Sequence, residues 1–411
     1  MSIAMQKSLK LTAACALIMA SANAAHANPV SGAFGEWKPI VDVRLRYEEV
    51  DQAPIVNNAE AGTVRARLGF ETGKAWNTAL LAEGEFVELW KSDFNSTVNG
   101  KTAFPVVADP KNKEINRLQL TNTSIDGTTI TLGRQRINID DQRFVGNVGW
   151  RQNEQTFDAL RVVNKSVKNL NIDATYLDRV NRVFGKSSPQ GEYQGNGFLA
   201  NASYQAPVGK FTGYAYLLDF DPIVGVATAA GDSTSTYGLR YSGQHPIGKV
   251  KLSYVAAFAH QSDYGSNPLS FADDYYFGEL TATFRQFSGG VGVEILDGNG
   301  VKGFTTPLAT LHKFQGWADK FLTTPANGID DRYVNLGWNK KGVGPFDTVS
   351  AVASYHKFES QRLSINYGSE VDLLLQAKLQ RFTAAVKYAD YNADKFATDT
   401  TKLWLQLEYV W

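Results

Sequence analysis

The chain has 411 residues, with 41 basic and 41 acidic side chains and a single cysteine. This charge balance gives no support to a nucleic-acid partner, which normally requires a strong basic excess. Beyond the N-terminal segment no run of about 18 apolar residues occurs, which excludes a membrane-spanning helix.

The N-terminus has the features of a secretory signal peptide covering residues 1–27. Lys7 and Lys10 form a positive region, residues 11–20 form an apolar core, and Ala25-His26-Ala27 supplies a small-x-small cleavage site. We therefore expect the chain to be exported.

Lipidation of Cys15 is the alternative for this segment. The preceding Thr12-Ala13-Ala14 resembles a lipobox poorly, and cleavage there would divide the apolar core. With the signal peptide removed, the mature chain 28–411 has no cysteine, as suits an export route in which stray thiols are oxidised.

The mature chain is dominated by segments in which apolar and polar residues alternate. In residues 41–48, four apolar side chains alternate with four charged ones, a period of two that is typical of a strand with one apolar face. About eighteen such strands are predicted, and bacterial single-chain barrels have an even number of strands. The predicted strands are 41–48, 64–71, 76–89, 114–125, 128–137, 155–164, 169–179, 196–206, 210–220, 234–243, 249–260, 273–286, 288–296, 331–340, 346–358, 369–380, 381–391 and 400–411.

The last ten residues, 402–411, form an amphipathic strand that ends on Trp411. An exposed terminal strand of this kind invites aggregation, so we expect it to pair with the first strand. The fold class predicted is an all-β, transmembrane antiparallel β-barrel with membrane lipid around it. The barrel-assembly machinery is the expected partner of the C-terminal strand.

The connections alternate between tight turns and long loops. Short links such as 73–74, 126–127 and 288–289 alternate with long ones such as 138–154 and 297–330. Short turns on one side and long extracellular loops on the other are typical of outer-membrane barrels. This pattern predicts a Gram-negative outer-membrane location with both termini in the periplasm.

Arginines on the predicted inner face are the candidate contacts for a solute. Rings of Arg or Lys favour anions, whereas mutual neutralisation by acids on the same wall is an equally simple interpretation. Arg134 and Arg136 share parity with Ile130 and Leu132, so these two arginines either lie past the lipid edge or are turned inward by a bulge. The candidate residues are Arg44, Arg46, Arg65, Arg67, Arg117, Arg134, Arg136, Arg143, Arg151 and Asp158.

The loop 297–330 is the longest and has a helix-like pattern. Thr306 suits a helix cap, Pro307 suits the first helical position, and apolar residues then recur at three- to four-residue steps. A long loop with structure of its own is usually a lid or a constriction. We expect it to be one of these.

The stretch 304–321 with 324–328 resembles the hallmark segment of the alginate export family of outer-membrane proteins. Residues 133–135, 143–144 and 150–158 are similar to a second block of that family. The resemblance implies an eighteen-stranded barrel with an arginine-rich constriction, which in the best-known member passes a polyuronate outward.

We therefore expect an outer-membrane channel, or porin, for a polar or anionic solute such as a polyuronate or an oligosaccharide. The alternative is a barrel enzyme that acts on lipid, which needs a nucleophile with a positioned base. The sequence shows neither a serine placed beside a histidine by an evident turn nor a metal-spaced cluster. No catalytic residue, metal site or cofactor is predicted.

Overall fold

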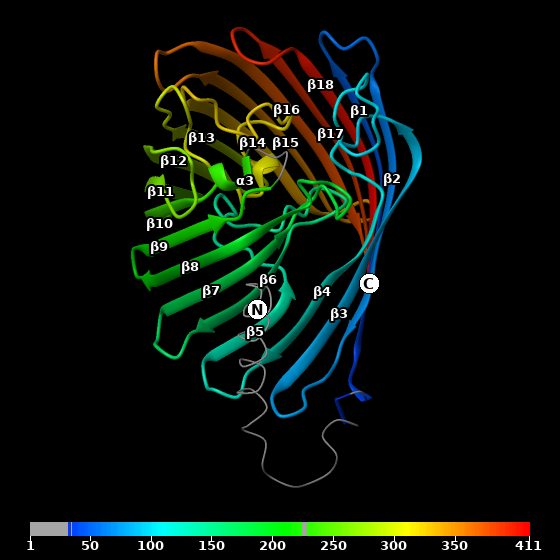
Figure 1. The fold of residues 1–411 in the computed structure, drawn as a ribbon, viewed down its shortest axis with the longest axis vertical. Coiled ribbons are helices and arrows are strands. Elements are labelled where there is room, and N and C mark those ends of the chain that lie inside the picture. Colours follow the sequence, from blue (N-terminus) through cyan, green and yellow to red (C-terminus); the bar gives the residue numbers. More distant parts are fainter. Residues whose placement is uncertain (1–31, 34, 224–227) are drawn as a thin grey trace.

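The computed structural model describes residues 32–33, 35–223 and 228–411, so the predicted signal peptide 1–27 lies outside the described residues. The described chain forms one closed sheet of eighteen antiparallel strands (Figure 1). The strands are β1 (Lys38–Gln52), β2 (Ala59–Glu71), β3 (Thr78–Asp93), β4 (Asn112–Asn122), β5 (Thr128–Gln135), β6 (Thr156–Asn164), β7 (Leu170–Asn181), β8 (Glu192–Ala206), β9 (Gly209–Phe220), β10 (Thr234–Ile247), β11 (Val250–Asp263), β12 (Ala272–Phe284), β13 (Phe287–Leu296), β14 (Ile329–Val343), β15 (Phe346–Glu359), β16 (Asn366–Leu379), β17 (Phe382–Ala393) and β18 (Thr400–Val410).

The barrel closes where the last strand meets the first. Strand β18 pairs antiparallel with β1 so that Leu407 lies opposite Leu45 and Glu408 opposite Arg44. Every other strand pairs with its neighbours in the sequence. The predicted fold class and closure are therefore confirmed, and the strands of the described residues leave no exposed edge.

The two faces of the wall have opposite character. On the outside, Leu45, Leu375 and Leu407 are 44–54% exposed, whereas on the inside Arg44 and Arg46 are 8% exposed or less. A water-soluble protein places these residue types the other way round. An apolar outer band and a polar interior are the arrangement that a lipid environment requires.

The alternation of connections agrees with the prediction in most places. One end of the barrel has tight turns, and at Gly127 and Gly248 these turns need positive φ angles of 68° and 60°. The other end has long loops, although 53–58 and 360–365 are no longer than the turn 72–77. Both the start of β1 and the end of β18 lie at the tight-turn end.

Besides the helical residues 32–33 and 35, the described residues contain two short helices, α3 (Thr228–Gly231) and the 3₁₀ turn η1 (Leu311–Lys313). Neither helix has the length or the apolar character needed to cross a bilayer. The helix predicted from Thr306 onward is thus reduced to one 3₁₀ turn. Gln315, Gly316 and Asp319 all adopt positive φ angles, which an α-helix cannot accommodate.

Candidate functional site

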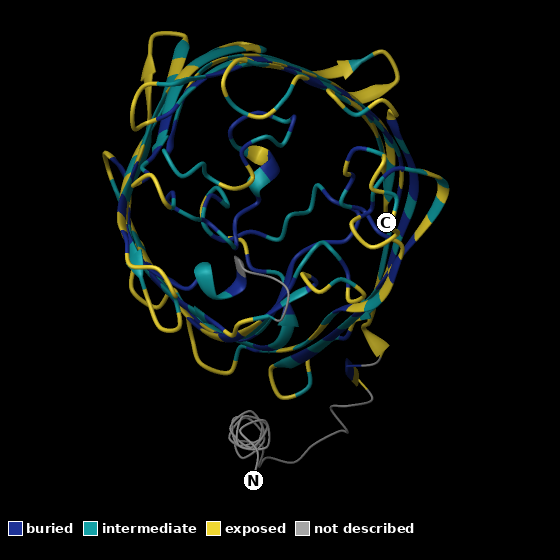
Figure 2. Ribbon diagram, turned by 45° about the horizontal axis from the view of Figure 1, so that its top comes forward, coloured by how far each residue is buried: buried dark blue, intermediate teal, exposed yellow. Residues whose placement is uncertain are grey.

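Two long loops fold into the barrel and meet inside it (Figure 2). We call residues 136–155 the first inward loop and residues 297–328 the second. Val145 and Leu308 form a parallel bridge between them, and the amide of Gly146 donates to the carbonyl oxygen of Leu308 at 2.8 Å. The second loop therefore meets the first inside the barrel, and its role as a constriction or a lid stays a prediction.

Arg44 and Arg46 on β1 hold the first inward loop against the wall. Arg44 donates to the carbonyl oxygens of Gly149 and Trp150 at 3.0 and 3.1 Å and to the carboxylate of Glu408 at 2.8 Å. Arg46 donates to the Trp150 carbonyl at 2.7 Å, and its guanidinium lies 4.1 Å from the centre of the Trp150 ring. These donors are therefore directed at the protein itself.

Arg65 and Arg67 on β2 form salt bridges with acids on the inner wall. Arg65 pairs with Asp42 and, at 2.9 Å, with Glu408. Arg67 pairs with Glu85 at 2.6 Å, and both arginines are nearly fully buried. The geometry favours mutual neutralisation over direct solute contact for these two residues.

Arg117 and Arg136 meet on one carboxylate of the inner wall. Arg117 pairs with Glu83 at 2.7 Å, and Arg136 reaches the same carboxylate at 3.3 Å. Arg136 also pairs with Glu154 of the first inward loop at 2.5 Å. Burial would raise the pKa of Glu154, but Arg67 and Arg136 outweigh it and hold the pKa below its usual value. Glu154 is therefore a charged anchor of the loop.

Arg134 and Asp158 do not line the lumen, in contrast to the prediction. Arg134 lies directly opposite Leu118 in the register of β4 and β5, so its side chain shares the outer face with that exposed leucine. It pairs there with Asp158 at 2.7 Å. Of the two placements considered for Arg134, the one past the lipid edge agrees with the register.

Arg143 of the first inward loop lies apart from the other arginines. It pairs with Glu294 on β13 at 2.6 Å and donates to the hydroxyl of Thr306 in the second inward loop at 3.0 Å. Burial would lower the pKa of Arg143, but the charge of Glu294 outweighs it and raises the pKa. This cation therefore fastens both inward loops to the wall.

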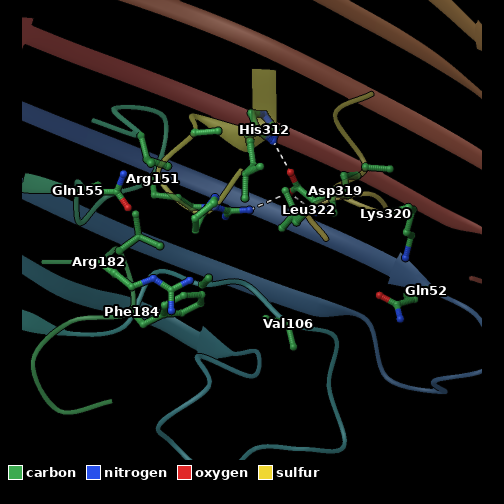
Figure 3. A pocket seen from close by; sticks show the side chains of 18 residues that line it. Gln52, Val106, Arg151, Gln155, Arg182, Phe184, His312, Asp319, Lys320 and Leu322 are labelled. Carbon is green, nitrogen blue, oxygen red and sulfur yellow. Dashed lines mark hydrogen bonds and ion pairs between the residues drawn. The ribbon is translucent and has the colours of Figure 1, made fainter. Parts of the chain in front are cut away.

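Arg151, one of the candidate solute contacts predicted from the sequence, lines an accessible cavity (Figure 3). This cavity, here called the vestibule, lies among the long loops. It also contains three cations that the sequence reasoning missed: Arg182, Lys320 and Lys402. The apolar lining side chains are Val106, Ala108, Val148, Val183, Phe184, Pro307, Ala309, Ala318, Leu311 and Leu322.

Sequence signals for the missed cations are weak. Arg182 and Lys320 lie in the long connections between predicted strands, and Lys402 is the third residue of the terminal strand β18. Burial, followed by the nearby Lys402 ammonium, lowers the pKa of Lys320 to about 8. Among the described residues no group of three or more His, Cys, Asp or Glu side chains is arranged as a metal site.

Comparisons with known proteins find no family model and no curated protein that matches the chain. They therefore give no support to membership of the alginate export family. The outer-membrane β-barrel that the resemblance implied does agree with the solved structures described next.

Solved structures do match. The crystal structure of OpdK from Pseudomonas aeruginosa with vanillate has a TM-score of 0.72 at 14% identity, over 92% of this chain and 100% of that one. OccAB4 from Acinetobacter baumannii has a TM-score of 0.71 at 13% identity, over 92% of this chain and 98% of that one. OccK5 (OpdH) from Pseudomonas aeruginosa has a TM-score of 0.66 at 15% identity, over 92% and 99%. The chain thus has the eighteen-stranded barrel fold of these outer-membrane proteins.

Proposed function

We propose that this chain is an outer-membrane channel for small anionic solutes, which enter the vestibule from the extracellular side while both termini lie in the periplasm. The observation that carries the proposal is the charge of the vestibule lining. Four cations, Arg151, Arg182, Lys320 and Lys402, face one acidic residue, Asp319. A low-dielectric cavity lined by one sign of charge concentrates ions of the opposite sign.

The rest of the lining narrows the class of solute. Most of the other vestibule side chains are apolar, including Phe184, Leu311 and Leu322. An apolar pocket with a few convergent charges suits a compact molecule with an apolar body and one anionic group. A small aromatic carboxylate fits this description better than the polyuronate or oligosaccharide expected from the sequence, and the similar OpdK structure contains vanillate.

Planar bilayers test the channel and its charge preference. Purified protein is expected to give discrete conductance steps, and in a gradient of sodium benzoate the reversal potential is expected to show that benzoate permeates more readily than sodium. The basic lining of the vestibule is the reason. The absence of steps, or a reversal potential of the opposite sign, contradicts the proposal.

Benzoate binding is expected to weaken as the pH rises through about 8, because the Lys320 ammonium then loses its proton. Loss of one partly screened charge is worth about 1 kcal/mol, or roughly fivefold in affinity. Calorimetric titration between pH 7 and pH 9 measures the effect. Lys320→Met is expected to remove this dependence, whereas Lys313→Met, which alters a lysine that lines a different cavity, is expected to retain it.

A further inference from the structure

Asp319 of the second inward loop is the centre of a buried ionic cluster (Figure 3). Its carboxylate accepts from Arg151 at 2.8 Å, from Lys402 at 2.7 Å and from Nδ1 of His312 at 2.6 Å. Side chains of Arg151, Asp319 and Lys402 are no more than 8% exposed. The loop is thus bound through one carboxylate to the first inward loop and to β18.

The charge states of this cluster are fixed by its surroundings. Burial alone would raise the pKa of Asp319, but the hydrogen bond from His312 and the charges of Lys402 and Arg151 outweigh it and hold the pKa well below its usual range. Burial lowers the pKa of His312, so its imidazole is neutral and Nδ1–H donates to Asp319. On its other side, Lys387 of β17 donates to Nε2 of His312 at 2.6 Å. Asp319 is therefore a permanent anion among fixed donors.

Arg151 and Lys402 also line the vestibule, so the cations that hold Asp319 face the cavity in which we place the solute. Two cations about one carboxylate form a site for a carboxylate group in general, because each forms charge-assisted hydrogen bonds with its oxygens. In this structure the carboxylate of Asp319 occupies that site.

The segment 311–319, here called the latch segment, separates two cavities. Leu311, His312, Ala318 and Asp319 line the vestibule. Residues 313–315 and Trp317 line a second cavity against β10 to β15. A path from one cavity to the other through this region requires the latch segment to move.

Further contacts fix the far side of the latch segment. The amide of Ala318 donates to Glu370 on β16 at 2.6 Å, and Gln315 donates to Glu294 on β13. A Cβ at Gly316 would overlap the Glu370 carboxylate, so the backbone lies directly on that side chain. These contacts face the wall, whereas two of the three donors to Asp319, Arg151 and Lys402, are nearly buried cations in the lining of the vestibule.

We propose that Asp319 is a built-in surrogate for the carboxylate of the transported solute, and that a solute carboxylate in the vestibule exchanges with it at Arg151 and Lys402 and releases the latch segment. This inference rests on the proposed function and names the event that opens the path. Withdrawal of Asp319 with no replacement removes the carboxylate partner of the buried Lys402 and leaves Arg151 with Glu48 and Asp109, at 3.2 and 3.7 Å. Loss of the partner of a buried cation is unfavourable. Exchange against a solute carboxylate keeps the charge count of the site unchanged.

Hydrogen exchange of the wild-type protein in detergent tests the exchange directly. Benzoate is expected to speed amide exchange in residues 311–319, whereas benzyl alcohol, which has the ring and no charge, is expected to leave it unchanged. Slower or unchanged exchange with bound benzoate overturns the proposal. This measurement needs no variant, so it holds even if substitution of Asp319 impairs folding.

Asp319→Asn removes the charge and keeps the shape of the side chain. We expect the variant to bind benzoate about tenfold more tightly than wild type, because no internal carboxylate competes for Arg151 and Lys402. We also expect its chloride conductance to be higher than that of wild type without benzoate, and benzoate to increase it no further. The matched control is Asp330→Asn, which removes one acid at the start of β14 whose partner is the exposed Arg332. This control is expected to behave as wild type.

The outcomes separate the two proposals. If wild-type protein gives a benzoate-permeable channel and Asp319→Asn has unchanged affinity and conductance, the surrogate is wrong and the channel stands. If the wild-type protein gives no discrete conductance steps, the channel itself fails, and the surrogate proposal fails with it.

Discussion

Replacing Arg44 with alanine is expected to release the first inward loop from the barrel wall and to raise the single-channel conductance. Arg44 donates to the carbonyl oxygens of Gly149, Trp150 and Arg151, three consecutive residues of that loop. Alanine leaves these oxygens and the Glu408 carboxylate with fewer donors. The expected loss of folding free energy is about 3 kcal/mol, the usual cost of removing one partner from a buried charged network.

Conductance in planar bilayers and urea unfolding in lipid vesicles measure the two effects of Arg44→Ala. Arg161→Ala is the matched control: Arg161 also lies on the wall and pairs with Asp173 at 2.5 Å, and its hydrogen bonds all go to that carboxylate. We expect the control to leave the conductance unchanged. Equal conductance in wild type and Arg44→Ala would show that other contacts hold the loop.

Replacing Leu375 with arginine is expected to destabilise the folded barrel by about 2–4 kcal/mol, the cost of placing this side chain at the bilayer midplane. Leu375 is 54% exposed and is the middle one of five apolar positions on the outer face of β16, which run from Val371 to Leu379. At that position an arginine cannot easily extend its guanidinium to the interface.

The adjacent residue provides the control for this prediction. Gln376 follows Leu375 on the same strand and therefore points to the opposite, lumenal face. Gln376→Arg is expected to change the free energy of unfolding by less than about 1 kcal/mol, because a surface in contact with water accommodates a charge. Urea unfolding in vesicles measures both variants, and similar losses in the two would contradict the assignment of faces.

The sequence by itself determined the wall of the barrel. Alternation with a period of two is a local property, so the outward Leu407 and the inward Glu408 were assigned correctly before their partners were known. The pairing of β18 with β1, which closes the barrel, was predicted from the amphipathic strand at residues 402–411. In β5, parity alone leaves Arg134 with two placements, and its register opposite Leu118 places it on the outer face.

Tertiary structure alone decided the interior. The contact of Arg44 with Trp150 joins residues 106 positions apart, and that of Lys402 with Asp319 joins residues 83 apart. No local period encodes such contacts. For the same reason the helix expected after Thr306 gives way to a loop in which buried ionic and backbone hydrogen bonds outweigh helical propensity. Strand faces follow from neighbours in the chain, whereas the vestibule follows from which distant loops meet inside the barrel.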